Sequence, residues 1–302
     1  MKEVPAISSP SDRPQAVIHD IGYRPYAGPR LGELRVARSL FVTGLRSCYG
    51  LGRSTRSKVL PVLLLIVILL PALILVAVMV QTKAGQQLLP YSRYAMVTQV
   101  VIAVFVASQA PALISSDLRF HTITLYLARP MRRSTYVLVR FASLTSAVFA
   151  LVLAPLTMLY AGGLLADLPV GRETGDYLLA VVGALLLAMV LAGLSAMVCA
   201  VTPKRGIAVA AVIVVLLVSY SVVAAIQVVA VEGRSLVLAQ AVGLFSPFTL
   251  IDGVQAWLFG AKASTPAPPD GAGMGILFCV ATLAVIAGSV GAMLLHYRKA
   301  LA

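Results

Sequence analysis

The feature that most constrains this chain is a set of long runs without Asp, Glu, Lys, Arg or His. A helix rises about 1.5 Å per residue, so about 20 such residues cross the roughly 30 Å hydrocarbon layer of a bilayer. Only 12% of the 302 residues are charged, whereas an ordinary soluble domain has roughly 25%. We therefore predict an all-α membrane protein with six transmembrane helices. The expected spans are residues 59–80, 95–114, 141–165, 177–201, 207–231 and 274–295.

Lys and Arg are divided unevenly between the two sides that six spans define. Nineteen of the 24 lie in residues 1–58 and 115–140, at 204–205 and at 298–299. Loops rich in Lys and Arg stay in the cytosol. We therefore expect a multi-pass protein of the cell membrane with both termini cytosolic. The net charge of +13 is then an orientation signal that meets lipid rather than nucleic acid.

Residues 1–58 form the expected cytosolic amino-terminal segment, and residues 59–302 form the six-span domain. The first 30 residues are polar and contain five prolines, which excludes a cleaved signal peptide and favours an extended segment. Between about residues 31 and 50, apolar residues recur at helical spacing, and they are Leu34, Ala37, Phe41, Leu45 and Cys48. Arg35, Arg38 and Arg46 fall on another sector. This pattern predicts an amphipathic helix lying in the membrane interface, with a soluble surface helix as the alternative.

The charged segment between the second and third spans is residues 115–140. We expect Ser115 or Ser116 to cap a short helix that ends before Pro130. The residues Thr122–Leu127 are rich in apolar side chains and need a cover if they face the cytosol. These features predict a coupling helix that docks on a partner; the alternative is a solvated basic loop that only sets orientation. The candidate coupling residues are Asp117, Arg119, His121, Arg129, Pro130, Arg132 and Arg133.

The segment between the fifth and sixth spans, residues 232–273, is the longest one expected outside the cell. Ser235 is placed to cap a helix up to about Leu244, and Pro247 separates it from a second helix that ends near Phe259. We predict an extracellular helical hairpin that enters the outer leaflet, with Trp257 at the interface. Asp252 is expected to make a helix cap or a structural hydrogen bond rather than to act in catalysis.

Small residues recur at helical spacing in the fourth and sixth spans, which lets helices approach closely. This spacing favours packing within the chain, and a face between two copies is the alternative. The residues concerned are Ala184, Ala188, Ala192, Ala196, Ala284, Gly288 and Ala292.

Motifs for catalysis and nucleotide binding are missing from the sequence. There is no GxxxxGK[ST] phosphate loop, no HExxH pair and no ordered Ser, Cys and His set. We therefore expect no catalytic, cofactor-binding or metal-binding residue and no enzymatic activity of the chain itself. The uncharged spans also lack the ionisable groups of ion-driven carriers, so the energy for transport would come from a partner.

Three stretches resemble the permease subunits of ABC-2 type exporters, which have the type V ABC transporter fold, and especially an actinobacterial branch. They are HDIGYRPYAGPRLGE, SSDLRFHTITLYLARPMRRSTYVLVRF and FSPFTLIDGVQAWLFG. In the family, the second stretch has an acidic and a basic residue, Leu-Tyr-Leu before Arg-Pro, then a tyrosine and Gly-Lys. Here Val139 and Arg140 occupy the place of that last pair.

The resemblance implies a subunit of an ATP-driven exporter that moves an amphiphilic or hydrophobic substrate outward. Two such permeases, identical or paralogous, would rest on two separate ATP-binding subunits, and ATP and magnesium would be bound only there. The resemblance also implies an amino-terminal helix at the inner interface, a coupling helix between spans two and three, and a hairpin between spans five and six. The alternatives are a passive channel or ion-coupled carrier, and a membrane assembly or sensor subunit that transports nothing.

Overall fold

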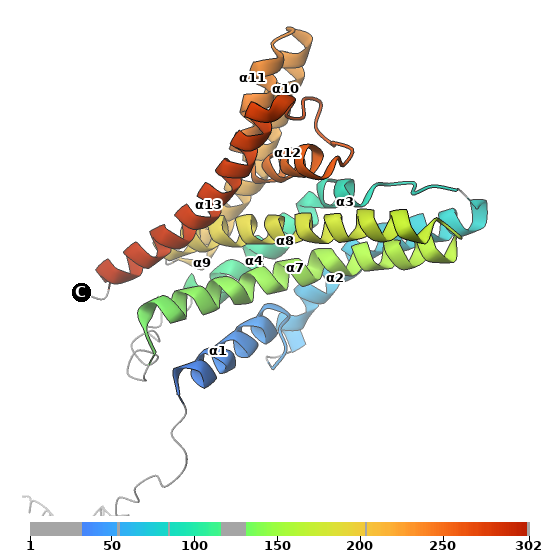
Figure 1. The fold of residues 1–302 in the computed structure, drawn as a ribbon. Helices are drawn as coiled ribbons and strands as arrows, with labels where there is room; N and C mark the ends of the chain where they lie inside the picture. The colour runs from blue at the N-terminus through green and yellow to red at the C-terminus, as the bar shows by residue number, and fades with distance from the viewer. Residues whose placement is uncertain (1–31, 53–54, 84, 116–130, 203, 301–302) are drawn as a thin grey trace, which may run out of the picture. The chain divides into compact units, whose positions relative to one another are not determined.

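A computed structural model describes residues 32–52, 55–83, 85–115, 131–202 and 204–300, with only the backbone for Arg56 and residues 298–300. Within these residues every regular element is a helix and no strand is present. The prediction of an all-helical chain is therefore confirmed for the described part. The elements (Figure 1) are α1 Glu33–Cys48, α2 Thr55–Thr82, α3 Tyr91–Val97, α4 Gln99–Leu113, α7 Arg133–Leu165, α8 Val170–Val201, α9 Arg205–Ile213, η2 Val214–Val218, α10 Ser219–Glu232, α11 Leu236–Val242, η3 Gly243–Phe245, α12 Pro247–Phe259 and α13 Gly271–Ala300.

Five helical segments are long and apolar enough to cross a bilayer, which is the pattern of a multi-pass membrane protein. Four are the helices α2, α7, α8 and α13. The fifth is the continuous run Arg205–Glu232, in which the π-helix η2 separates α9 from α10. The helix α7 has 33 residues, or about 50 Å at 1.5 Å per residue, so it extends well beyond a 30 Å hydrocarbon layer.

The run predicted as a single span over residues 95–114 is divided in the structure. The helices α3 and α4 meet at Thr98 with a bend of 63°, and only the pair together is long enough to cross a bilayer. The Thr98 hydroxyl donates to the Tyr94 carbonyl, 2.8 Å away, a side-chain bond that often bends helices. The Tyr94 hydroxyl in turn donates to the Ile68 carbonyl of α2. Tyr94 therefore holds α3 against the first span, α2, while α4 continues at an angle of 63° to α3.

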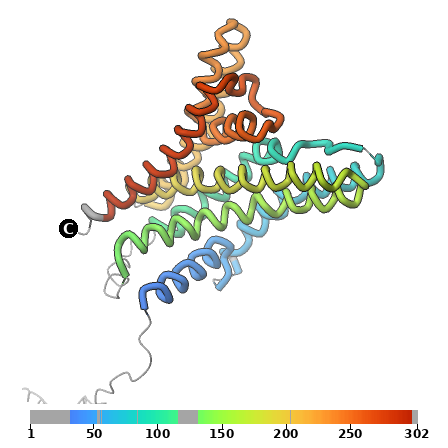
Figure 2. Tube along the Cα trace, in the orientation of Figure 1, coloured from blue at the N-terminus to red at the C-terminus, as the bar shows by residue number. Residues whose placement is uncertain are grey.

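The helices α7 and α8 form the centre of the described bundle. They run antiparallel, are joined by residues 166–169, and pack along each other (Figure 1). The helix α13 packs on both of them and runs at an angle to them, as the trace in Figure 2 shows, and α1 and α2 pack on α7. About 56% of the most apolar window of α7 and of α8 is buried, against 22% for α2, for the α9 to α10 run and for α13. The outer helices therefore present apolar faces suited to lipid or to another chain.

The two rows of small residues face different surroundings. In α8 the four alanines at 184, 188, 192 and 196 are buried, so this row serves packing within the chain. In α13, Ala284 and Gly288 are exposed. Only the first row therefore follows the expectation of intrachain packing.

A close contact between α12 and α13 gives a test of this packing. A Cβ at Gly275 would lie 2.0 Å from the ring of Trp257, so Gly275→Ala forces the indole away. We expect a loss of about 1–3 kcal/mol in the free energy of unfolding. The measurement is thermal unfolding of the purified chain in mild detergent, followed by the fluorescence of its single tryptophan.

Gly291→Ala in the same helix is the matched control, because no atom lies within 4 Å of an added Cβ there. This variant should be unchanged or more stable by about 0.5–1 kcal/mol. Equal stability losses for the two variants would contradict the predicted contact.

Candidate functional site

The structure describes the two flanks of the predicted coupling loop, Ser115 and the segment from Met131 onward. Asp117, Arg119, His121, Arg129 and Pro130 lie outside the described residues. Arg132 and Arg133 are described and exposed, at the start of α7. The segment 116–130 therefore joins the end of α4 to the beginning of the longest helix.

The first flank, Ser115, is fixed to the end of α8. Its side chain is 1% exposed, and its hydroxyl lies 3.1 Å from both the Cys199 and the Thr202 carbonyl oxygens. Carbonyls in the last turn of a helix have no partner within the helix, so an outside hydroxyl satisfies them. The segment that follows α4 is thus hydrogen-bonded to the carboxyl end of α8.

The second flank is capped by a side chain from a distant helix. Arg132 is the N-cap residue of α7, and its own side chain makes no capping bond. Instead Glu33 of α1 accepts the Arg132 backbone N–H at 3.1 Å and the Thr135 hydroxyl at 2.6 Å, both on Oε1. These two hydrogen bonds, with that of Thr135 the larger cause, lower the pKa of the Glu33 carboxyl. A carboxylate at this place also matches the positive end of the α7 dipole.

The helix α1 runs parallel to the first four turns of α7 and is attached along its whole length. Beyond the Glu33 contact, Ser143 donates to the Phe41 carbonyl at 3.3 Å, where Gly44 permits the close approach. At the other end the Tyr49 hydroxyl donates to the Ala147 carbonyl at 2.8 Å. Contacts therefore hold α1 against the start of α7 at both ends and in the middle.

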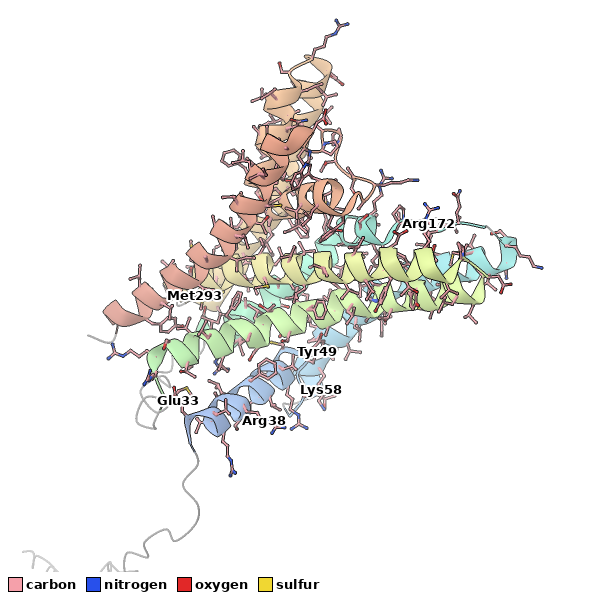
Figure 3. All side chains as sticks on the ribbon, viewed as in Figure 1. Glu33, Arg38, Tyr49, Lys58, Arg172 and Met293 are labelled. Atoms are coloured by element: carbon pink, nitrogen blue, oxygen red, sulfur yellow. The ribbon has the colours of Figure 1, made fainter. Side chains whose placement is uncertain are left out.

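The outer sector of α1 carries the arginines that the sequence pattern singled out. Arg35, Arg38 and Arg46 are all exposed, and Figure 3 labels Glu33 and Arg38 on this helix. The predicted apolar stripe is only partly followed: Ala37 and Cys48 are buried, whereas Leu34 is 84% exposed. The face against α7 is shifted by about one residue and is formed by Ala37, Leu40, Gly44 and Cys48.

Arg140 occupies an unexpected place. It lies inside α7, is 6% exposed and sits over the ring of Tyr136 at 5.5 Å. Tyr136 in turn meets Tyr297 of α13 edge to face, with ring centroids 5.9 Å apart. The start of α7 is therefore packed against the end of α13 through aromatic side chains. The last part of the predicted polar segment 115–140 is thus helical and, from Tyr136, partly buried.

Sequence reasoning missed four residues that shape this site, namely Glu33, Tyr49, Tyr136 and Tyr297. Glu33 carries a weak signal, since it is the only acidic residue among the basic residues of segment 21–58. Which helix it would cap is a matter of tertiary structure that no local pattern contains.

The candidate residues of the segment between α10 and α13 lie in and around α12. Pro247 is the first residue of that helix, where its missing N–H costs nothing. Asp252 is 4% exposed and accepts the Ser264 and Thr265 backbone N–H groups and the Thr265 hydroxyl, at 2.9–3.1 Å. Its hydrogen bonds are structural. Trp257 packs its ring on Gly275 of α13.

The strap after α12, residues 260–265, is held by charged side chains from two sides. Asp252 binds its backbone N–H groups, and Arg93 of α3 donates to the Ala263 carbonyl from Nε at 3.1 Å and Nη2 at 2.6 Å. The strap begins at Gly260, whose φ of 63° allows the left-handed end of α12. This clamp fixes the end of α12 to α3.

Among the residues that the structure describes, no group of three His, Cys, Asp or Glu side chains is placed to hold a metal ion. The chain matches no known protein-family model and no curated protein.

The Glu33 contact predicts a specific dependence of stability on pH. Because folding lowers the pKa of this carboxyl, its contribution is fully present above the ordinary value of about 4.3 and is lost as the pH falls through the lowered pKa. The melting temperature should therefore differ between the wild type and Glu33→Gln at pH 7, and the difference should shrink below about pH 4.

Glu232→Gln is the control for this experiment, because Glu232 is exposed at the end of α10 with no hydrogen bond or ion pair among the described residues. A melting-temperature difference for Glu33→Gln that persists unchanged at low pH would contradict the capping role.

Asp252 gives a second prediction. Asp252→Ala leaves the Ser264 and Thr265 N–H groups without an acceptor, which should cost about 2–4 kcal/mol in unfolding free energy. Asp252→Asn keeps one acceptor oxygen and should cost less. Thermal unfolding in detergent measures both, and Thr265→Val, which removes only the hydroxyl donor, should cost about 1 kcal/mol. Equal losses for Ala and Asn would exclude this bonding pattern.

Proposed function

We propose that the chain is a transmembrane permease subunit of an ATP-driven exporter of the ABC-2 type, which moves an amphiphilic or hydrophobic substrate outward. Two copies of a separate ABC ATP-binding subunit would bind and hydrolyse ATP with magnesium. The proposal rests on the sequence resemblance and on the attachment of the loop between α4 and α7. It assigns residues 116–130 the role of the surface that receives the ATPase.

The observation that carries the proposal is that both flanks of this loop are fixed to different helices. Ser115 is bonded to the end of α8, and the start of α7 is bonded to Glu33 of α1. A loop with free ends would absorb a push from a partner. Because these ends are fixed to two central helices and to α1, a push is transmitted into the bundle.

A cavity of about 550 Å³ lies beside the second flank, between the start of α7 and the end of α13. Arg132 and Arg133 line it on one side and Leu294 and Tyr297 on the other. This composition suits a partner segment that offers both acidic and apolar side chains. Such a segment would meet α7 and α13 together.

We assign the end of the bundle with the loop flanks to the cytosol. Arg35, Arg38 and Arg46 of α1, Arg132 and Arg133 of α7, and Lys204 and Arg205 beside the end of α8 belong to this end. Loops rich in such residues are cytosolic. With α3 and α4 counted as one bent crossing, the chain has six spans, both termini are cytosolic, and the α11 to α12 hairpin enters the membrane from outside.

The exposed faces support a second permease beside this one. The α9 to α10 run and α13 bury little of their apolar surface within the chain, and the exposed Ala284 and Gly288 of α13 leave room for close helix approach. The second chain would be identical or paralogous, and lipid would cover what it leaves free.

The test is purification of the tagged chain from its native membrane in mild detergent. We expect a protein with a nucleotide-binding P-loop to copurify and to hydrolyse ATP in the complex. Ser115→Ala should lower this hydrolysis about fivefold without dissociating the complex, because one hydrogen bond of about 1 kcal/mol changes an equilibrium by that factor.

Ser108→Ala is the matched control, since the Ser108 hydroxyl donates to the Phe105 carbonyl and accepts from the Gln109 amide, both within its own helix. Absence of a bound ATPase, or equal hydrolysis by the Ser115 and Ser108 variants, would contradict the proposed coupling.

One observation favours the ion-coupled carrier as a second candidate. Glu173, in the first turn of α8, is 5% exposed although the sequence showed uncharged spans. Buried carboxylates in membrane helices are the usual binding groups for coupling ions. Solute movement by the purified chain alone in liposomes, without ATP and dependent on an ion gradient, would establish this alternative.

A further inference from the structure

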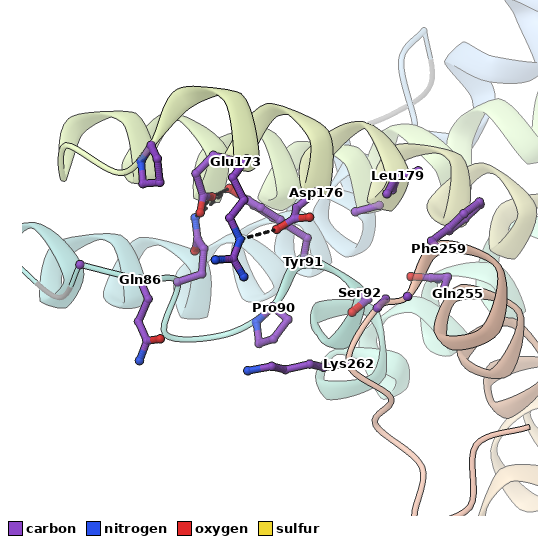
Figure 4. A pocket seen from close by; sticks show the side chains of 17 residues that line it. Gln86, Pro90, Tyr91, Ser92, Glu173, Asp176, Leu179, Gln255, Phe259 and Lys262 are labelled. Carbon is purple, nitrogen blue, oxygen red and sulfur yellow. Dashed lines mark hydrogen bonds and ion pairs between the residues drawn. The ribbon is translucent and has the colours of Figure 1, made fainter. Parts of the chain in front are cut away.

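A cavity of about 270 Å³ lies at the opposite end of α7 and α8 from the loop flanks. Its walls come from three places (Figure 4): the segment leading into α3, the first turns of α8, and the end of α12 with its strap. The strap is fixed by Asp252 and Arg93, so this wall is rigid. None of the candidate residues singled out in the sequence lines it.

The floor of the cavity holds a buried carboxylate in a fixed orientation. Glu173 Oε2 accepts the Tyr91 hydroxyl at 2.7 Å and Gln87 Nε2 at 2.9 Å. No described residue donates to Oε1, although the carboxyl lines the cavity. One oxygen is thus occupied in positioning the group, and the other is available to a ligand.

A second polar group lining the cavity has no protein partner. Gln255 of α12 is 5% exposed, and its side-chain amide makes no hydrogen bond to any described residue. It fits only because residue 183 of α8 is glycine: a Cβ there would lie 2.6 Å from Gln255 Nε2. Gly183 lies ten residues beyond Glu173 on α8, or about 15 Å along the helix, so this amide marks the end of the cavity opposite to the carboxylate.

The walls and the rim define the kind of ligand. Leu179, Ala180 and Phe259 supply apolar surface. At the rim Arg172 and Asp176 face each other at 3.9 Å and are both exposed, and Lys262 is exposed as well. Glu173 is therefore the one buried charged residue among those that line the cavity, and apolar surface lies beside it. This combination suits a hydrogen-bond donor with a positive charge and a short hydrocarbon part.

We propose that this cavity binds a small amphiphilic organic cation, such as an alkylammonium ion. The ammonium group donates to Glu173 Oε1, and the hydrocarbon part runs along Leu179 toward Phe259 at the other end of the cavity. The proposal goes beyond the proposed function and does not depend on it, because the site lies within one chain and needs no ATPase.

The test uses the purified full chain in lipid nanodiscs, with hexylammonium as the probe and 1-hexanol as its neutral counterpart. Hexylammonium should raise the melting temperature in a saturable manner, and 1-hexanol should not. Glu173→Gln keeps an oxygen for Tyr91 and Gln87 but removes the charge, and it should weaken hexylammonium binding about tenfold or more.

Asp176→Asn is the matched control, because it removes a carboxylate that lies at the exposed rim, and binding should change by less than about threefold. If Glu173→Gln does not fold, Leu179→Gln, which removes apolar surface from the wall at a partly exposed position, should weaken binding in its place. Equal stabilisation by 1-hexanol, no saturable effect of hexylammonium, or unchanged affinity in the folded Glu173 or Leu179 variant would each overturn the proposal.

Discussion

A helix that begins outside the membrane must find acceptors for its first N–H groups, and α7 finds one in the carboxylate of a different helix. Arg132 cannot cap its own helix, so the contact from Glu33 sets the place of α1 against α7. The rest of the pairing follows from that register: Gly44 meets Ser143 and Tyr49 reaches Ala147. Since α8, α2 and α13 all pack on α7, a capping interaction at one end organises the centre of the described bundle.

The long apolar runs could be predicted from the sequence because a single segment that crosses lipid must be a helix. A chain without water must satisfy its backbone internally, so an uncharged run of 20 residues predicts a helix with little ambiguity. The break near Ser246 and Pro247 was equally readable, because proline is favoured in the first turn of a helix and makes the residue before it extended, as Ser246 is here. These are local constraints, and the helices α11 and α12 lie where such constraints place them.

What the sequence could not supply depends on partners far away in the chain. The bend at Thr98 arises in part because Tyr94 bonds to Ile68 of α2. No pattern in residues 95–114 predicts that contact. The burial of Arg140 and Glu173 likewise requires knowing which aromatic side chains lie beside them. Both residues fell just outside the uncharged runs, so hydropathy placed them in loops although their helices extend further.

The helices that depart from regular geometry are neighbours. The π-helix η2 interrupts the α9 to α10 run next to α4, which itself begins at the Thr98 bend. A π-turn holds one more residue than an α-turn, and such irregular turns are frequent at functional sites. Around them, α7 and α8 are straight, well buried and fixed to the loop flanks. The two irregular elements differ in burial: α4 is largely buried within the chain, whereas the α9 to α10 run leaves most of its apolar surface open to lipid or a second chain. Irregular turns therefore occur both within the described bundle, where α3 meets α4, and on its exposed side, at η2.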